Sequence, residues 1–159
     1  MGYALQSLLR IRLLREDRAS GELTVARQAV AAAQATLDER IHELEEFNQT
    51  RENRRDRIYE TIIGHAVTRE QLDLAQEGVA RIDEEGVLKA DNVIRAKSDL
   101  HTREEEAKVA HANFVIASKD RMKIDEHKAN WVLADAKEQE HRTEIELEDF
   151  TGRKQNLDD

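Results

Sequence analysis

The sequence contains no proline and no cysteine, and it has few of the residues that end helices or fill compact cores. Without proline, the strongest helix breaker is missing from all 159 residues. Without cysteine, the chain forms no disulfide and has no thiol chemistry, which suits the cytosol. Six glycines and an aromatic content of 4% are low for a globular domain of this size. These absences point away from a globular enzyme and toward long helices.

Long apolar runs are also missing. No stretch approaches the roughly 18 consecutive apolar residues of a membrane-spanning helix. Arginines interrupt the apolar residues near the N-terminus, so this segment is not typical of a secretory signal. The formal net charge of −9, from 34 acidic and 25 basic residues, disfavours nucleic acid as a partner. We therefore expect a cytoplasmic protein that neither inserts directly into a membrane nor binds nucleic acid.

What the sequence does have is a heptad repeat. Apolar residues recur at alternating steps of three and four, which places them on one stripe of a helix, as in a coiled coil. The first half carries two such rows: Leu9, Leu23, Val30, Leu37, Leu44 and Ile58, and Leu5, Ala19, Ala26, Ala33 and Phe47. The second half carries two more: Leu72, Val79, Val93, Leu100, Ala107 and Phe114, and Ala75, Ile82, Ala96, Ala110, Ala117, Ile124, Trp131 and Ile145. A disordered polar chain would have no reason to space its apolar residues in this way.

Two seams with one interruption predict an all-α fold, a long antiparallel two-helix coiled-coil hairpin that forms one domain over 1–159. We expect helix one over about 3–63, a turn at 64–67, helix two over about 68–150 and a frayed tail at 151–159. Gly64 suits the end of a helix, and Thr68 with Gln71 matches a capping box. Gly78 and Gly86 leave two alternatives open, a bend or break between residues 78 and 90, or a helix that tolerates both glycines.

The hairpin pairs Leu37 with Val93 and brings Leu23 near Ala107 within one monomeric chain. Four seam arginines interrupt the apolar rows, and we expect most of them to lay their stems on the seam and keep their charged heads in water. They are Arg12, Arg40, Arg51 and Arg54. Arg40 also has the alternative of an ion pair with Asp91.

No catalytic constellation is present in the sequence. It lacks a glycine-rich phosphate loop and a HExxH zinc motif, and no two histidines are three or four residues apart. Paired carboxylates are interpreted as solvated helix faces, because a thin hairpin offers no pocket to shift their pKa values. We expect no enzyme activity, no cofactor and no metal site.

Two surfaces are candidates for binding a partner. At the tip, apolar residues exceed what two helices can bury, although some of them could simply close the seam: Tyr59, Ile62, Ile63, Val67 and Leu72. At the end that holds both termini, arginines gather on helix one, where they could bind carboxylates of a partner or fold onto the acidic C-terminal segment. These residues are Arg10, Arg12, Arg15 and Arg18, and Trp131 completes the candidate surface.

Helix two is longer than helix one, so residues from about 127 to 150 are expected to have no partner in the hairpin. Unpaired apolar side chains such as Trp131, Ile145, Leu147 and Phe150 often mark a binding site. The alternatives are that the first N-terminal residues fold along this overhang, or that the helix frays.

Several features together resemble the stalk proteins of type III secretion systems, the YscO/FliJ family. They are the Leu/Arg-rich run from Leu8 to Ala19, the stretch from Lys123 to Trp131 followed by an acidic segment, and two proline-free helices in a chain of this length. The resemblance implies an antiparallel hairpin in the pore of the hexameric export ATPase. It also implies contact with the cytoplasmic domain of the export gate and with export chaperones, at the inner membrane.

The resemblance carries over no catalytic residue. Two alternatives remain for the function, a generic cytoplasmic coiled-coil adaptor and a parallel homodimeric structural coiled coil, because the same heptads would serve either.

Overall fold

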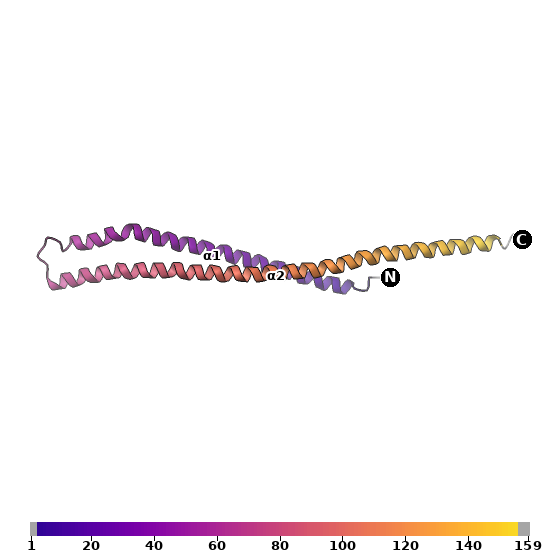
Figure 1. Cartoon of the computed structure of the whole chain (residues 1–159), viewed down its shortest axis with the longest axis horizontal. Coiled ribbons are helices and arrows are strands. Elements are labelled where there is room, and N and C mark those ends of the chain that lie inside the picture. The colour runs from indigo at the N-terminus through magenta and orange to yellow at the C-terminus, as the bar shows by residue number, and fades with distance from the viewer. Residues whose placement is uncertain (1–2, 156–159) are drawn as a thin grey trace. The chain divides into compact units, whose positions relative to one another are not determined.

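The computed structural model describes residues 3–155, with side chains described for 3–148. It contains two α-helices, α1 (Gln6–Glu60) and α2 (Arg69–Gln155), and the described residues include no strand (Figure 1). The two helices pack against each other in antiparallel directions. The predicted all-α helical hairpin is therefore confirmed.

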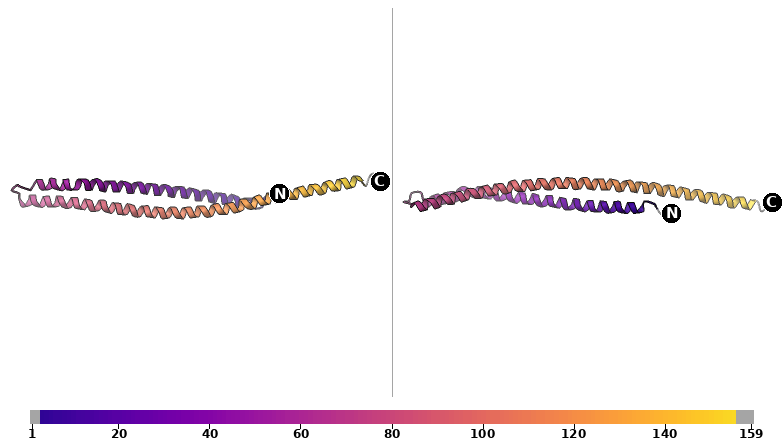
Figure 2. Two further views of the ribbon diagram at one scale, coloured as in Figure 1. Left: turned by 45° about the horizontal axis from the view of Figure 1, so that its top comes forward. Right: turned by 90° about the horizontal axis from the view of Figure 1, so that it is seen from below.

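The contacts divide the chain into two compact units, each containing a segment of α1 and a segment of α2. Unit 1 comprises Met1–Glu22 with His111–Asp159, and unit 2 comprises Leu23–Ala110. Within unit 2, the two segments run side by side in Figure 1 and in the left view of Figure 2, joined by the turn at the tip.

The helix ends differ by a few residues from the predicted ones. Helix α1 ends at Glu60, and the backbone turns through residues 61–64 before α2 begins at Arg69. Helix α2 continues to Gln155, so residues 151–155 belong to the helix rather than to the expected frayed tail. The rest of that tail, residues 156–159, lies outside the described residues.

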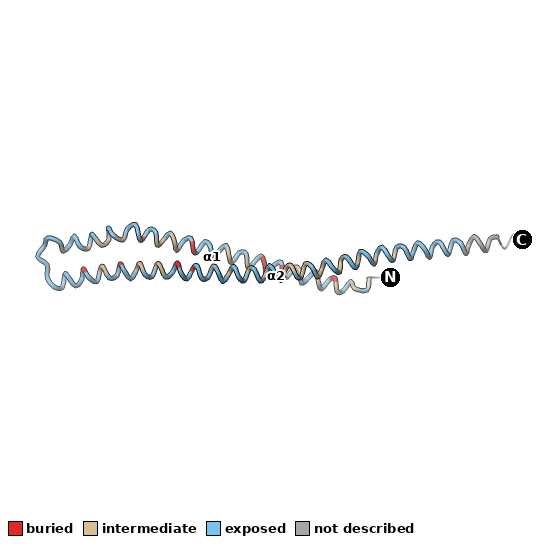
Figure 3. The backbone as a smooth tube through the Cα atoms, viewed as in Figure 1, coloured by how far each residue is buried: buried red, intermediate tan, exposed pale blue. Residues whose placement is uncertain are grey.

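The core of unit 2 is the narrow seam that the heptads predict. Leu37, Val93 and Ala96 form a buried cluster, and the half-buried side chains of Leu44 and Leu100 pack against it. Further buried positions of the seam in this unit are Leu23, Ala33, Phe47, Ala75 and Ile82. In Figure 3 the buried and half-buried positions of the two segments gather on the sides that face each other. The predicted pairing of Leu37 with Val93 is confirmed.

Helix α2 passes through Gly78 and Gly86 without a break, so the alternative of a broken helix is wrong. Both glycines face α1. A Cβ at Gly78 would lie 3.1 Å from Cδ1 of Ile58, and a Cβ at Gly86 would lie 2.9 Å from Cε1 of Phe47. The missing side chains leave room for two large apolar residues of the opposite helix.

The seam of unit 1 uses fewer apolar residues. Leu9 and Ala19 are buried on α1. Between them, the Arg12 guanidinium donates a hydrogen bond to Asp120 on α2, at 2.7 Å from Nη1 to Oδ2. Polar pairs thus replace part of the apolar seam in this unit.

Candidate partner-binding surfaces

The tip is built by a glycine turn and a capped helix. Backbone N–H groups of Ile62 and Ile63 donate to the carbonyl of Tyr59, and Gly64 then takes the left-handed conformation with φ 77°. The N–H of Thr68 donates to Oε1 of Gln71 at 2.9 Å, and the N–H of Gln71 donates to the hydroxyl of Thr68 at 3.3 Å. This is the predicted capping box, and it fixes where α2 starts.

The turn leaves most of the predicted tip residues in solvent. Tyr59, Val67 and Leu72 are 42%, 38% and 41% exposed, and Ile63 is 70% exposed. Ile62 is half-buried. The seam is closed here by Ile58 over Gly78 rather than by Leu72. The structure therefore brings the five predicted residues together around one turn and keeps four of them accessible.

A shallow hollow of about 390 Å³ lies beside the turn, in unit 2. Its walls come from both helices: Arg57, Ile58, Thr61, Ile62, Gln71, Leu74 and Ala75. Leu74, which is 63% exposed, was missed by the sequence analysis because it falls outside the heptad rows. The only signal for it was its place two residues after Leu72. With Leu74 included, the tip is an apolar surface with a recess.

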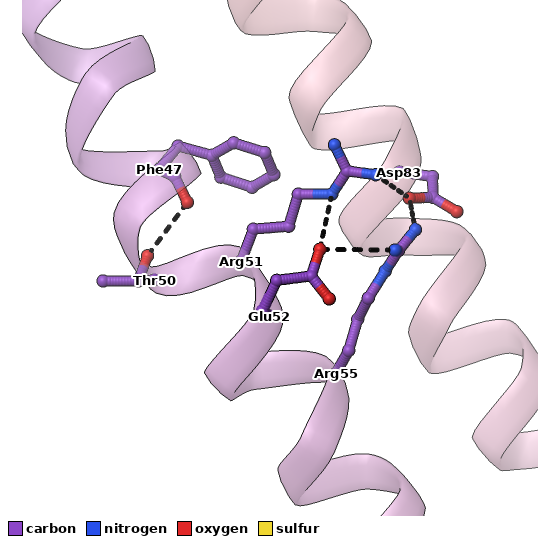
Figure 4. A network of polar contacts seen from close by, with 6 residues as sticks. All are labelled: Phe47, Thr50, Arg51, Glu52, Arg55 and Asp83. Carbon is purple, nitrogen blue, oxygen red and sulfur yellow. Dashed lines mark hydrogen bonds and ion pairs between the residues drawn. The ribbon is translucent and has the colours of Figure 1, made fainter.

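Behind the tip, arginines of α1 reach across to acids of α2. Arg51 and Arg55 both contact Asp83, and Glu52 lies next to both arginines (Figure 4). Of these two, Arg51 is a predicted seam arginine, and its guanidinium contacts a carboxylate of α2 in a pair that stays exposed to solvent. The reason is that antiparallel packing places a carboxylate within reach of each guanidinium.

Arg54 also pairs with an acidic residue of the opposite helix. Its Nη2 donates a hydrogen bond to Oε2 of Glu85 at 2.7 Å, and its guanidinium carbon lies 5.6 Å from the centre of the Phe47 ring. This hydrogen bond lowers the pKa of Glu85, because it stabilises the ionised carboxylate, and it raises the pKa of Arg54. A second hollow, of about 440 Å³, is lined by Phe47, Arg54 and Glu85 together with Glu43, Glu46, Gln49, Thr50 and Lys89.

Arg40 pairs with Glu43 of its own helix at 2.7 Å. The alternative pairing with Asp91 is therefore wrong. Residues three apart on one helix are neighbours, so the local carboxylate meets the guanidinium without any contribution from α2.

In unit 1 the four predicted arginines divide into two kinds. Arg12 is held by Asp120 and is only 29% exposed, so its charge is already satisfied within the hairpin. Arg18 pairs with Glu22 on the same helix at 3.0 Å but remains 83% exposed. Arg10 and Arg15 are exposed, and neither has an ion pair among the described residues. The accessible basic surface is thus Arg10, Arg15 and Arg18.

Exposed apolar side chains lie among these arginines. Ile11, Leu13 and Leu14 are 47%, 44% and 63% exposed. The heptad analysis missed them as surface residues because it considered only the seam. We call this set of α1 residues, Arg10 to Arg18, the terminal surface. Its mixture of cations and apolar groups is suited to binding a protein surface that carries carboxylates.

Trp131 is not left unpartnered. The centre of the Tyr3 ring lies 5.5 Å from the centre of the Trp131 ring and 5.8 Å from that of the His127 ring. The Tyr3 hydroxyl is hydrogen-bonded to Nδ1 of His127 at 2.8 Å. The expectation that residues from 127 onward have no partner in the hairpin is therefore wrong for His127 and Trp131. The alternative that N-terminal residues fold along α2 is confirmed for Tyr3. Farther along, Val132, Leu133 and Ile145 are 49%, 63% and 45% exposed. The Phe150 side chain lies outside the described residues.

The described residues present accessible surfaces and open grooves. Within residues 3–148, no three histidine or acidic side chains come together in a way that could hold a metal ion. Among the described helices, none has a stretch apolar and long enough to span a membrane. Both pronounced hollows in unit 2 are open grooves lined by charged and apolar side chains, and such grooves are suited to contacts with proteins.

Comparison with known proteins gives a consistent picture. Residues 5–153 match the sequence model of the family described as type III secretion protein YscO. A search of curated proteins finds no match. Among solved structures, the type III secretion protein YscO from Vibrio parahaemolyticus is similar with a TM-score of 0.81 and 20% identity, over 92% of each chain. The YscO homologue CT670 from Chlamydia trachomatis is similar with a TM-score of 0.71 and 20% identity, over 96% of this chain and 93% of that one.

Proposed function

We propose a coupling role for this chain, which belongs to the YscO family of type III secretion proteins. In this proposal the hairpin is a non-enzymatic stalk that links the hexameric export ATPase to the cytoplasmic domain of the export gate. Its place is in the cytoplasm, peripheral to the secretion apparatus at the inner membrane. Export chaperones are further proposed partners. The protein acts as a monomer.

The observation that carries the proposal is the presence of two chemically different accessible surfaces on two different units. The tip in unit 2 is apolar, with Tyr59, Ile63 and Leu74 exposed. The terminal surface in unit 1 is basic, with Arg10, Arg15 and Arg18 exposed. A coupling protein needs two such separate surfaces, whereas a structural coiled coil needs only its seam.

We assign the tip to the export gate and the terminal surface to the ATPase. Apolar side chains in solvent gain free energy when a partner buries them, at roughly 25 cal/mol per Å². The arginines offer planar donors that match carboxylates of a ring subunit. The two assignments are independent, because no residue belongs to both surfaces.

The experiment that tests this function is direct binding of the purified chain to the purified cognate ATPase and, separately, to the purified gate domain. We expect saturable binding to both, and we expect the chain to bridge the two when all three are mixed. A chain that binds neither protein, or that binds only as a dimer, would favour the adaptor or the homodimeric coiled coil instead. Light scattering on the same samples gives the oligomeric state.

A further inference from the structure

Trp131 is a predicted partner contact, yet it already packs against another residue of the same chain. It is the only tryptophan of the chain and was predicted to contact a partner, yet its ring is half-buried against the ring of Tyr3. His127 lies one turn before Trp131 on the same face of α2, and it also contacts Tyr3. Tyr3 therefore occupies part of the face of α2 that His127 and Trp131 would offer to a partner.

Tyr3 lies before the first residue of α1. The N–H of Gln6 donates to the carbonyl of Tyr3 at 3.1 Å, so a single turn joins Tyr3 to the helix. Leu5 is half-buried, and Leu9 is the first side chain of α1 that is buried, at 5% exposed. Residues before a helix are usually poorly ordered unless side chains hold them down. Within the described residues, the contacts of Tyr3 with His127 and Trp131 are the ones that hold this segment against α2 ahead of Leu5.

We propose that Tyr3 is a releasable clasp that covers Trp131 and must leave before a partner binds there. The proposal rests on the proposed function, because it assigns Trp131 of α2 to the ATPase contact together with the terminal surface of α1, as the sequence analysis grouped them. It names the chemistry of the partner group as well. The group that replaces Tyr3 is an aromatic side chain, since it must pack on the indole of Trp131 beside the imidazole of His127.

The contact of Tyr3 with His127 and Trp131 is weak compared with the packing of a buried core. It consists of one exposed hydrogen bond and two tilted ring contacts, at 51° and 44° between ring planes. Release leaves Leu9 and the pair between Arg12 and Asp120 in place, so the hairpin itself need not open. Together, ring contacts and a hydrogen bond of this kind favour the closed state over the released state by about tenfold.

The first test uses the fluorescence of Trp131, which reports this site alone because the chain has no other tryptophan. Tyr3→Ala should shift the emission to longer wavelength and increase quenching by acrylamide. Tyr3→Phe keeps the ring and loses the hydroxyl, so it should give a smaller shift. Tyr59→Ala removes the other tyrosine and is the matched control, with no shift expected. Emission of Tyr3→Ala equal to that of the wild type, with helicity retained, would overturn the clasp.

The second test measures affinity for the purified cognate ATPase. Tyr3→Ala should bind about tenfold more tightly than the wild type, because the closed state no longer competes with the partner. Trp131→Ala should bind more weakly, and the double variant should behave like Trp131→Ala. Unchanged affinity of Tyr3→Ala together with weakened binding of Trp131→Ala would overturn the clasp alone. Unchanged affinity of Trp131→Ala would overturn the assignment of Trp131 to the ATPase contact, whatever the fluorescence shows.

Discussion

The ring of Phe47 on α1 occupies the space that a side chain would fill at position 86 on α2. A Cβ at Gly86 would lie 2.9 Å from Cε1 and 3.3 Å from Cζ of Phe47. Phe47 is only 4% exposed, so moving its ring away from position 86 would disturb a buried contact of the seam. Gly86 is therefore a packing residue, and its lower helix propensity is the cost of that close contact.

We predict that Gly86→Ala lowers the free energy of unfolding by about 1 kcal/mol, because overpacking costs more than the gain in helix propensity. Gly21→Ala is the matched control, since no atom lies within 4 Å of a Cβ at this second helical glycine. It should raise the free energy of unfolding by about 1 kcal/mol through helix propensity. Thermal unfolding followed by circular dichroism checks both, and midpoints that move in the same direction would contradict the close packing.

A second prediction concerns the turn. Gly64 has φ 77°, which costs an L-amino acid about 1–2 kcal/mol. Gly64→Ala should therefore destabilise the hairpin, although no atom blocks its Cβ. Gly64→Asn should cost less, because asparagine tolerates the left-handed region. Chemical denaturation of the two variants separates conformational strain from packing, and equal losses would show that strain is not the cause.

The pair of Arg54 and Glu85 predicts a dependence of stability on pH. The hydrogen bond from Arg54 lowers the pKa of Glu85 below its ordinary value of 4.5. The stabilisation of the folded state by this hydrogen bond is therefore complete above pH 4.5 and is lost as the pH falls through the lowered pKa of Glu85. The difference in unfolding free energy between the wild type and Glu85→Gln should shrink over this acidic range. Glu84→Gln is the control, because it removes the same charge from the adjacent exposed position without touching Arg54. A difference that stays constant down to pH 3 would contradict the pairing.

For the tip, we predict that Tyr59→Ala combined with Ile63→Ala weakens binding to the gate domain and leaves helicity near that of the wild type. The two side chains are 42% and 70% exposed, so their loss costs little folding free energy. Val25→Ala combined with Ile94→Ala removes apolar residues elsewhere in unit 2 that are 66% and 64% exposed, and this variant should bind normally. Calorimetric titration gives the affinities, and equal affinities for the two double variants would remove the tip as the gate contact.

For the terminal surface, charge reversal at Arg10 and Arg15 should weaken binding to the ATPase and reduce its sensitivity to salt. Arg12 is unsuitable for this test, because its guanidinium is bonded to Asp120 and its reversal would disturb the hairpin. Reversal at Arg27 and Arg95 changes the net charge equally at other exposed positions. If both double variants lose the same affinity, the effect is one of overall charge, and the terminal surface is not the contact.

The sequence was sufficient for the seam, the capping box and the place of the turn to within a few residues, because each depends on residues close together along one helix or turn. Leu37 and Val93 follow from the heptads, and Thr68 with Gln71 follows from the spacing of three. The sequence was insufficient to predict contacts that depend on the rotation of one helix against the other. That rotation decides that Arg54 reaches Glu85 and that Gly86 receives Phe47.

The candidate surfaces were predicted only in part, for a similar reason. Exposure of Tyr59 and Ile63 follows from an excess of apolar residues at a turn. The shielding of Trp131 by Tyr3 depends instead on how the residues before α1 fold back, and heptad periodicity carries no information about a segment outside the helix.

The arginine pairs have a consequence for the alignment of the two helices. A seam rich in alanine and leucine repeats every seven residues, so sliding one helix by a heptad would still bring apolar residues together. The same slide would move Arg54 from Glu85 to Gly78 or Asn92, and would move Arg55 from Asp83 to Gln76 or Ala90. None of these four residues carries a charge. The heptad repeat alone thus fits several alignments, and the arginine pairs, like the contact of Phe47 with Gly86, favour the one observed.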